Sequence, residues 1–386
     1  MEKTKKIKIN NLVIKNYRSI ENLELKPKQI NVIVGKNNTG KSSILYAIDI
    51  FCSKSLDHLA ESKYFGSFSN KPQYEINVKA KNAEISCNKN KATLFKSLKL
   101  IDTEKRNKLT QMIYKIINEK VKTEISEEQK LHYINLIFQY YDFVIAFFPD
   151  GTVTIRPYPI DPKKSAHDLF KDTSENVQFS FEFAELFNWL NGFPEINWEE
   201  NLSVGQKNVQ FVSDDLKKRF FKQFNEKQLI EFEFFLKDND VIPNLERLTF
   251  DSIVTKSSSG EIETIPFEFY GDGTIVLINT LYYLHQAKNG ILLIEEPENH
   301  LHPGFLNIFI DTIFKYSEKL KIQVFMTSHS YDLIEEILAY SQKNGKEREL
   351  MITLMVKKKG IIEKTDFPFA KANRYLNQLR IDLRGI

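Results

Sequence analysis

The chain has 386 residues, 42% of them hydrophobic, which is enough for two modest domains with a sizeable core. Its 54 Lys and Arg residues against 51 Asp and Glu residues neither require nor exclude nucleic acid as a partner, although a protein dedicated to coating DNA would be more basic. Cys52 and Cys87 have no paired spacing, and no apolar segment is long enough for a signal peptide or a membrane span, so we expect a cytoplasmic protein without a membrane partner.

Residues 7–34 predict two or three strands, the last of which, residues 30–34, is apolar enough to be buried. The segment Gly35-Lys36-Asn37-Asn38-Thr39-Gly40-Lys41-Ser42 follows directly and matches the phosphate-binding loop G-x-x-x-x-G-K-[ST]. Residues 43–51 have helical spacing, so the positive N-terminal end of a helix would face the phosphates. A Gly- and Asn-rich turn could match by chance, but strand, loop and helix occur in the order that nucleotide binding requires.

Each part of this loop has an expected task. Gly35 and Gly40 let the backbone curl so that successive N–H groups face phosphate oxygens. Lys41 would place a positive charge at the β- and γ-phosphates, and the Ser42 hydroxyl can bind Mg²⁺. The other loop residues expected to contact the nucleotide are Lys36, Asn37, Asn38, Thr39 and Ser43.

The middle of the chain gives weaker signals. Strand-like stretches at 74–80 and 83–87 precede a region of helical spacing from about residue 91 to 141. A hairpin is expected over 143–158, where Pro149-Asp150-Gly151-Thr152 supplies the turn, and residues 214–237 are helix-like. No heptad pattern is long enough for a coiled coil. The aromatic residues of this region fill its own core or dock a partner: Phe181, Phe183, Phe187, Trp189 and Trp198.

A second chemical motif lies near the other end of the chain. Four apolar residues, 291–294, run into Glu295, Glu296, Pro297 and Glu298, which predicts a strand buried in a parallel sheet. Acidic residues at its carboxyl end would lie where such sheets bind ligands. Glu295 is then expected to hold Mg²⁺ through water, and Glu296 to orient or deprotonate the attacking water. The alternative is a strand that ends in solvated charges.

Three histidines follow. His329 comes after an apolar strand at 322–327, a position where a lone histidine usually has a structural role. His300 and His302 alternate with Leu301 like metal ligands, but a metal site usually has further Cys or His ligands nearby. We therefore expect no structural zinc.

Together, four segments resemble the ABC-type ATPases of the OLD-like (overcoming lysogenization defect) and RecF/SMC branch: residues 14–20, the loop 35–43, the block 294–303 (IEEPENHLHP) and residues 327–330 (TSHS). The EEPENHLHP block favours the OLD-like side, since RecF and SMC heads usually carry a DD or DE pair at this place. The resemblance covers the two ends of the chain and not the middle.

The resemblance implies an α/β fold, a P-loop ABC-type ATPase head with a mixed sheet, a β-rich N-terminal lobe and an inserted, mainly helical subdomain. The expected domains are an N-terminal ATPase lobe over 1–90, the insertion over 91–250 and a C-terminal ATPase lobe over 251–386. The cofactors would be ATP and Mg²⁺. Within the site, Arg18 would join the nucleotide contacts, and His329 would sense the γ-phosphate.

ATPases of this type also use a signature loop, which reaches across a dimer to the partner's γ-phosphate. Two segments are candidates. Residues 202–206 (LSVGQ) resemble the LSGGQ sequence but lie far before the acidic strand. The segment Gly271-Asp272-Gly273-Thr274 is followed by one helix-length stretch and then the acidic strand, which is the order of the family, so we expect it to be the signature. Thr274 would then replace the usual serine.

The function implied is slow ATP hydrolysis in a homodimer that ATP holds together, so that the chain acts as a switch or sensor. The chain ends before a Toprim nuclease domain could be built, and we expect a separate effector, such as a nuclease, in a prokaryotic antiviral defence system. Two alternatives remain: a RecF-like DNA-repair ATPase that clamps DNA, and a scaffold that binds ATP with little turnover.

Overall fold

The computed structural model describes residues 7–54, 83–95, 141–159, 196–198, 208–212, 225–257, 259–301 and 303–378, together with isolated positions between 103 and 135. The chain divides into two compact units. The first comprises Met1–Asn10, Lys26–Leu45 and Gln206–Ile386, and the second comprises Asn11–Leu25 and Tyr46–Gly205. Among the described residues, no helix combines the length and the apolar character that a membrane crossing needs.

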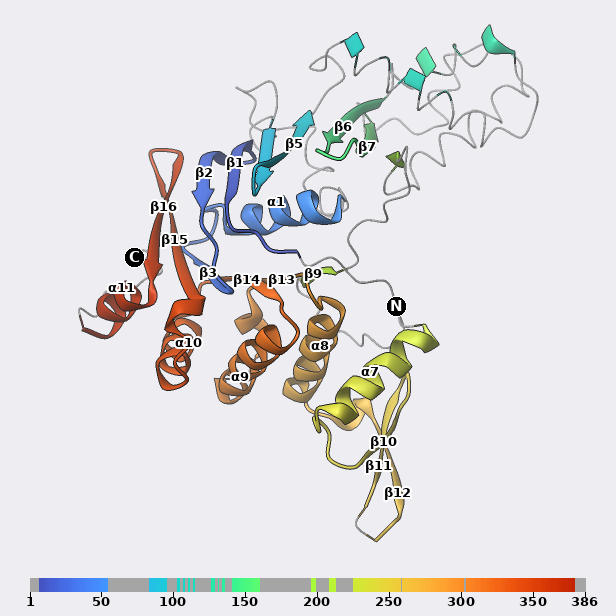
Figure 1. Cartoon of the computed structure of the whole chain (residues 1–386), viewed down its shortest axis with the longest axis vertical. Coiled ribbons are helices and arrows are strands. Elements are labelled where there is room, and N and C mark those ends of the chain that lie inside the picture. Colours follow the sequence, from blue (N-terminus) through green and yellow to red (C-terminus); the bar gives the residue numbers. More distant parts are fainter. Residues whose placement is uncertain are drawn as a thin grey trace. The chain divides into compact units, whose positions relative to one another are not determined.

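The first unit is built on a six-stranded sheet with the strand order β16-β15-β3-β14-β13-β9 (Figure 1). Its strands are β3 (Ile30–Val34), β9 (Val209–Val212), β13 (Ile291–Glu295), β14 (Gln323–Ser328), β15 (Leu350–Lys358) and β16 (Ile361–Pro368). The pairs from β15 to β9 are parallel, and β16 is antiparallel to β15. Every residue of β3 and β14 is buried, as is all of β13 except Glu295. The strands predicted at 30–34 and before Glu295 are confirmed.

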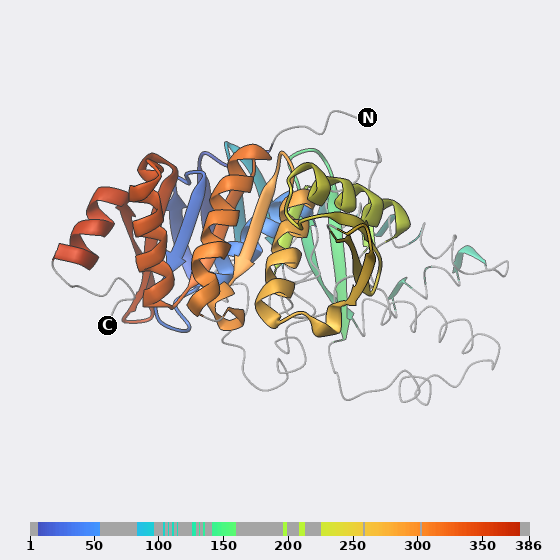
Figure 2. The same cartoon turned by 90° about the horizontal axis from the view of Figure 1, so that it is seen from below.

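Three helices lie side by side along one face of this sheet: α8 (Asp272–Gln286), α9 (Pro303–Lys319) and α10 (Tyr331–Lys343) (Figures 1 and 2). In α10, Leu333, Ile334, Ile337 and Leu338 are buried, a spacing that turns one apolar face to the core. The Ser330 side chain caps this helix by accepting a hydrogen bond from Leu333 N at 3.2 Å. Side chains of the sheet and of these helices form one hydrophobic core.

Other elements of the first unit surround this core. Helix α7 (Glu226–Asp238) begins with a capping box between Asn225 and Gln228 and packs beside a three-stranded antiparallel sheet. That sheet consists of β10 (Leu245–Leu248), β11 (Ser252–Lys256) and β12 (Ile262–Pro266). The unit also contains the short 3-10 helices η5 (Phe267–Phe269), η6 (Pro297–His300) and η7 (Glu347–Glu349). Its last elements are the helix α11 (Phe369–Asn373) and the π-helix η8 (Arg374–Gln378). Glu233 accepts a hydrogen bond from Leu248 N at 2.7 Å, which joins α7 to β10.

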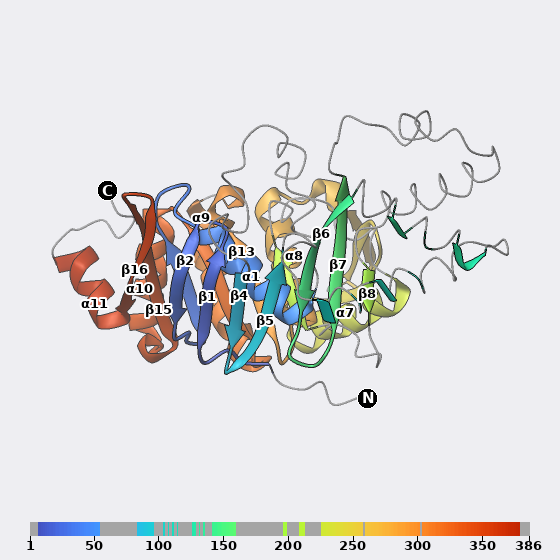
Figure 3. The ribbon, with the colours of Figure 1, turned by 90° about the horizontal axis from the view of Figure 1, so that it is seen from above.

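The second unit contains a seven-stranded antiparallel sheet with the order β2-β1-β4-β5-β6-β7-β8 (Figure 3). Its strands are β1 (Leu12–Tyr17), β2 (Ile20–Leu25), β4 (Ala83–Cys87), β5 (Asn90–Phe95), β6 (Tyr141–Phe147), β7 (Val153–Pro159) and β8 (Ile196–Trp198). The hairpin β6–β7 confirms the prediction for 143–158. Lys54 Nζ binds the Asp150 carboxylate and Thr152 Oγ1 at this hairpin.

The two units divide the chain differently from the three ranges predicted from the sequence, which stay a prediction. Strands β1 and β2 pair in the antiparallel sheet of the second unit, and β9 pairs with β13 in the sheet of the first unit. A four-residue strand whose partner is distant in the sequence has no local signal that reveals this pairing. Most of the region predicted to be helical, the stretch 74–80 and the side chains of the five aromatic residues lie outside the described residues.

Candidate active site

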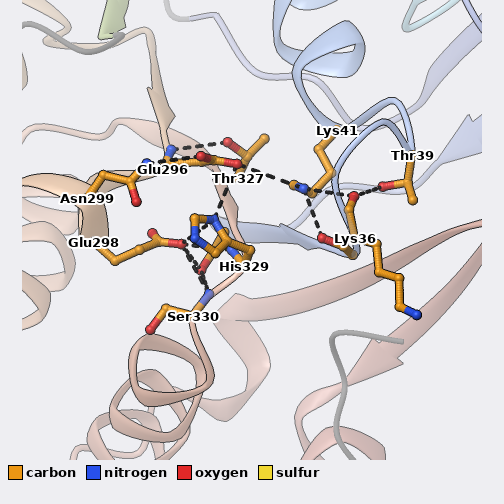
Figure 4. Close-up of polar contacts among 11 residues, drawn as sticks. Lys36, Thr39, Lys41, Glu296, Glu298, Asn299, Thr327, His329 and Ser330 are labelled. Atoms are coloured by element: carbon orange, nitrogen blue, oxygen red, sulfur yellow. Dashed lines mark hydrogen bonds and ion pairs between the residues drawn. The ribbon is translucent and has the colours of Figure 1, made fainter. Parts of the chain in front are cut away.

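Three neighbouring parallel strands bring the predicted motifs to one edge of the first unit's sheet. In the strand register, Val34 at the end of β3 pairs with Ser328 of β14, and Thr327 pairs with Glu295 of β13. The loops that follow these strands therefore begin at the same edge. They are the glycine-containing loop, the segment with His329 and the segment with Glu296 (Figure 4).

The loop after β3 has a backbone that requires glycine. Gly35 has φ +148°, and a Cβ added there would lie 2.3 Å from the Met355 carbonyl oxygen of β15. Gly40 has φ +86° and Asn38 has φ +64°. Thr39 is buried and its hydroxyl donates to Lys36 O at 2.8 Å, so this side chain closes the loop on itself (Figure 4). The side chains of Lys36, Asn37 and Asn38 are exposed.

Lys41 is the first residue of helix α1 (Lys41–Ser53), which begins in the first unit. Its side chain is 5% exposed, and Nζ donates to Gly35 O at 2.8 Å and to Lys36 O at 3.1 Å. Nζ also lies 3.9 Å from Glu296 Oε1. Burial lowers the pKa of the Lys41 ammonium, and the nearby carboxylates, Glu296 foremost, oppose this shift. The ammonium is therefore held over the loop between carbonyl and carboxylate oxygens.

The residues predicted to bind Mg²⁺ provide oxygen atoms. Ser42 is half-buried in the first turn of α1 and Ser43 is buried beside it, while Glu295 is half-buried at the end of β13. Among the described residues, no group of three or more His, Cys, Asp or Glu side chains could hold a metal ion. A hydroxyl and a single carboxylate fit Mg²⁺, which usually keeps several waters and takes further oxygens from nucleotide phosphates.

Glu296 lies at the centre of the site. Its backbone is left-handed, with φ +44° and ψ +59°, a conformation that costs a non-glycine residue free energy. The carbonyl and the hydroxyl of Thr327, both at 3.2 Å, accept hydrogen bonds from Glu296 N and hold this conformation. Oε2 accepts from Asn299 Nδ2 at 3.0 Å, and Oε1 lies 3.4 Å from His329 Nδ1. The side chain is 25% exposed, so water can reach it.

His329 lies between two carboxylates (Figure 4). Its Nδ1 is 3.4 Å from Glu296 Oε1 and 3.5 Å from Glu298 Oε1. Glu298 was part of the motif quoted from the sequence but had no predicted task, and the same is true of Asn299 and Thr327. The sequence shows that Glu296 and Glu298 are two residues apart. That both carboxylates contact His329 depends on the pairing of β13 with β14, which the sequence does not show.

The segment predicted as the signature begins helix α8. Gly271 is exposed at the N-cap, and Thr274 N donates to Gly271 O at 3.0 Å. A Cβ on Gly271 would meet nothing within 4 Å, whereas a Cβ on Gly273 would lie 2.5 Å from the Phe305 ring. Only the backbone of Asp272 is described, and residues 202–206 lie outside the described residues. The choice between the two segments therefore stays a prediction.

Some of the predicted site residues that the structure describes do not contact Lys41, Glu296 or His329. Within the described residues, no hydrogen bond or ion pair links Gly271 or Thr274 to Lys41, Glu296 or His329. Arg18 belongs to the second unit, in the turn between β1 and β2, where its guanidinium carbon lies 4.5 Å from the centre of the Tyr46 ring. Its contact with nucleotide stays a prediction. The side chains of His300 and His302 lie outside the described residues.

Two protein-family models match parts of the chain that contain Lys41, Glu296 and His329. A family model described as "AAA domain, putative AbiEii toxin, Type IV TA system" matches residues 161–335, and a model of a protein family of unknown function matches residues 7–133. An uncharacterized protein of Methanocaldococcus jannaschii, MJECL11, is 35% identical over 98 residues, which cover 25% of this chain and 84% of that protein.

Two relatives align with most of the chain. An ATP/GTP phosphatase of Helicobacter pylori is 21% identical over 345 residues, covering 85% of this chain and 86% of the relative. Endonuclease GajA of Bacillus cereus is 24% identical over 358 residues, covering 86% of this chain but only 57% of GajA. Among solved structures, an SMC head bound to the C-winged helix domain of ScpA has a TM-score of 0.44 at 13% identity, covering 95% of this chain and 100% of that chain. The AAA-domain match over residues 161–335 and the alignments with the phosphatase and with GajA support an ABC-type AAA ATPase of the OLD-like group.

Proposed function

We propose that the chain binds ATP with Mg²⁺ and hydrolyses it slowly, as a nucleotide-gated dimeric switch. One observation carries this proposal: Glu296 Oε1 lies 3.9 Å from Lys41 Nζ and 3.4 Å from His329 Nδ1, at the ends of three adjacent parallel strands. A buried ammonium can stabilise phosphate charge, and a solvent-accessible carboxylate beside an imidazole at the same sheet edge can position the attacking water. The name of the Helicobacter pylori relative, an ATP/GTP phosphatase, is consistent with this chemistry.

In this proposal each group has one task. Lys41 stabilises the charge of the β- and γ-phosphates, and the backbone of residues 35–42 surrounds them. Ser42 and Glu295 would hold Mg²⁺, which offsets phosphate charge when bound. Glu296 orients or deprotonates the attacking water, and His329 contacts the γ-phosphate. Because Glu296 already contacts both Lys41 and His329, a change at the phosphate can alter the position of all three side chains.

The switch requires a second copy of the chain, whose Gly271–Thr274 segment would contact the γ-phosphate. Gly271→Glu is expected to prevent ATP-dependent association while ATP binding by the monomer persists, because a carboxylate would approach a phosphate across the interface. Gly271 suits this test since its Cβ position is open, whereas a side chain at Gly273 would force the Phe305 ring to shift. Light scattering with a slowly hydrolysed ATP analogue measures the association.

Gly205→Glu provides the comparison for this prediction, since it alters the competing segment at 202–206. We expect its association to resemble that of the wild type. If Gly205→Glu blocks association and Gly271→Glu does not, the signature lies at 202–206.

We further propose that the chain is the ATPase component of a prokaryotic antiviral defence system and works with a separate effector such as a nuclease. Its similarity to endonuclease GajA, of which it spans 57%, supports this proposal. The purified chain is expected to hydrolyse ATP but to cut neither DNA nor RNA with Mg²⁺ or Mn²⁺. Nuclease assays on wild type and Lys41→Ala measure this, and robust cleavage by the chain alone contradicts it. ATP-dependent clamping of duplex DNA without an effector would favour a DNA-repair ATPase instead.

A further inference from the structure

Glu298 forms a cluster of contacts that the proposed chemistry does not use. It lies in η6, two residues after Glu296, and its side chain is only 9% exposed. Oε1 accepts hydrogen bonds from Ser328 Oγ at 2.7 Å, His329 N at 2.7 Å and Ser330 N at 3.1 Å. One carboxylate oxygen thus binds three successive residues of the segment that joins β14 to α10 (Figure 4).

The buried Glu298 carboxylate needs hydrogen-bond donors, and residues 328–330 supply them. A buried carboxylate is unfavourable unless donors surround it, and hydrogen bonds to a charged acceptor are the stronger ones. All three of these donors meet Oε1, whereas the buried Oε2 has no hydrogen-bond partner among the described residues. Ser330 also caps α10, and Ser328 Oγ accepts from Ser330 N at 3.0 Å. Glu298 therefore fixes the backbone at the end of β14 and at the start of α10.

The His329 ring depends on this arrangement. The side chain is 45% exposed, so core packing does not hold it in place. The ring position follows from the backbone that Glu298 binds and from the two carboxylates at 3.4 Å and 3.5 Å. Because Glu296 and Glu298 are both in the short segment after β13, a displacement of that segment changes both contacts of the ring together.

We propose that Glu298 is the positioning residue for His329 and couples the segment after β13 to the segment between β14 and α10. The proposal rests on the proposed ATPase function, in which His329 contacts the γ-phosphate. In this role Glu298 acts through His329 and not on the nucleotide. Its role is to hold the His329 ring in a position from which it contacts both the Glu296 carboxylate and the γ-phosphate.

A double-mutant cycle tests this coupling. Glu298→Ala is expected to lower kcat for ATP hydrolysis at least about tenfold with a much smaller change in KM, because the lost effect is on the placement of a group rather than on nucleotide affinity. In a His329→Ala background, Glu298→Ala is expected to change kcat less than about twofold. Glu298→Gln should recover part of the loss, since an amide oxygen can accept the same three hydrogen bonds. Equal factors in both backgrounds would overturn the proposal.

A second measurement does not depend on turnover. His329 N and Ser330 N both donate to Glu298, so amide hydrogen exchange at these positions is expected to accelerate in Glu298→Ala and to stay close to wild type in Glu335→Gln, an exposed acidic position on α10. Unchanged exchange at the His329 and Ser330 amides overturns the proposal even if no variant hydrolyses ATP. If the wild type lacks ATPase activity, the proposed function fails separately, and exchange alone decides whether Glu298 holds this segment.

Discussion

Replacing Glu296 by glutamine is expected to leave ATP binding nearly intact and to lower the rate of hydrolysis by roughly 10²- to 10⁴-fold, the range attributed to a positioned general base. Glutamine keeps the size of the side chain, and its carbonyl oxygen can still accept a hydrogen bond from Asn299 Nδ2. It cannot take a proton from water. Phosphate release measures the rate, and nucleotide titration measures affinity.

The control for this variant is Glu335→Gln, which makes the same chemical change at an exposed position on α10. It should hydrolyse ATP as the wild type does. Normal hydrolysis by Glu296→Gln would remove Glu296 from the catalytic role and leave the proton acceptor to another group. Loss of ATP affinity in Glu296→Gln would instead indicate that this carboxylate supports the loop through Lys41.

Replacing Lys41 by alanine is expected to weaken ATP binding by at least about ten- to a hundredfold. A hydrogen bond to a charged group contributes about 1.5–3 kcal/mol, and 1.4 kcal/mol corresponds to about a tenfold change in Kd. The variant also frees the Gly35 and Lys36 carbonyls that Lys41 Nζ binds, so the loop loses an internal contact as well. Calorimetric titration with ATP and Mg²⁺ measures the affinity.

Lys26→Ala is a matched control, since Lys26 is an exposed lysine of the first unit. It removes the same charge and should bind ATP as the wild type does. Thermal unfolding of both variants separates a lost phosphate contact from a damaged fold. A Lys41→Ala protein with a wild-type unfolding temperature and wild-type affinity would contradict the assignment of the loop.

The sequence was most informative where chemistry and local structure depend on neighbouring residues. Gly35, Gly40 and Lys41 are adjacent to a buried strand and a helix start, and the structure confirms that order. The strand before Glu295 and the hairpin β6–β7 were predicted for the same reason. In each case, hydrophobic pattern and turn residues within a short window determine the element.

Features that depend on distant residues could not be predicted in this way. The place of β3 between β14 and β15, and thus the contact between Lys41 and Glu296, follows from strand pairings between distant segments. Glu298 binds residues 328–330 only because β13 and β14 are neighbours. The close approach of Gly273 to Phe305 depends on the packing of α8 against α9. Sequence alone identified these residues without indicating their contacts.

The central claim is that one site, formed by Lys41, Glu296 and His329, binds and hydrolyses ATP. The most direct test is a single phosphate-release assay with ATP and Mg²⁺ on the wild type, Lys41→Ala and Glu296→Gln, with bound nucleotide measured on the same preparations. We predict turnover at the full rate only by the wild type, and far less bound ATP in Lys41→Ala than in the wild type and Glu296→Gln. Hydrolysis by Lys41→Ala at the wild-type rate would contradict the account.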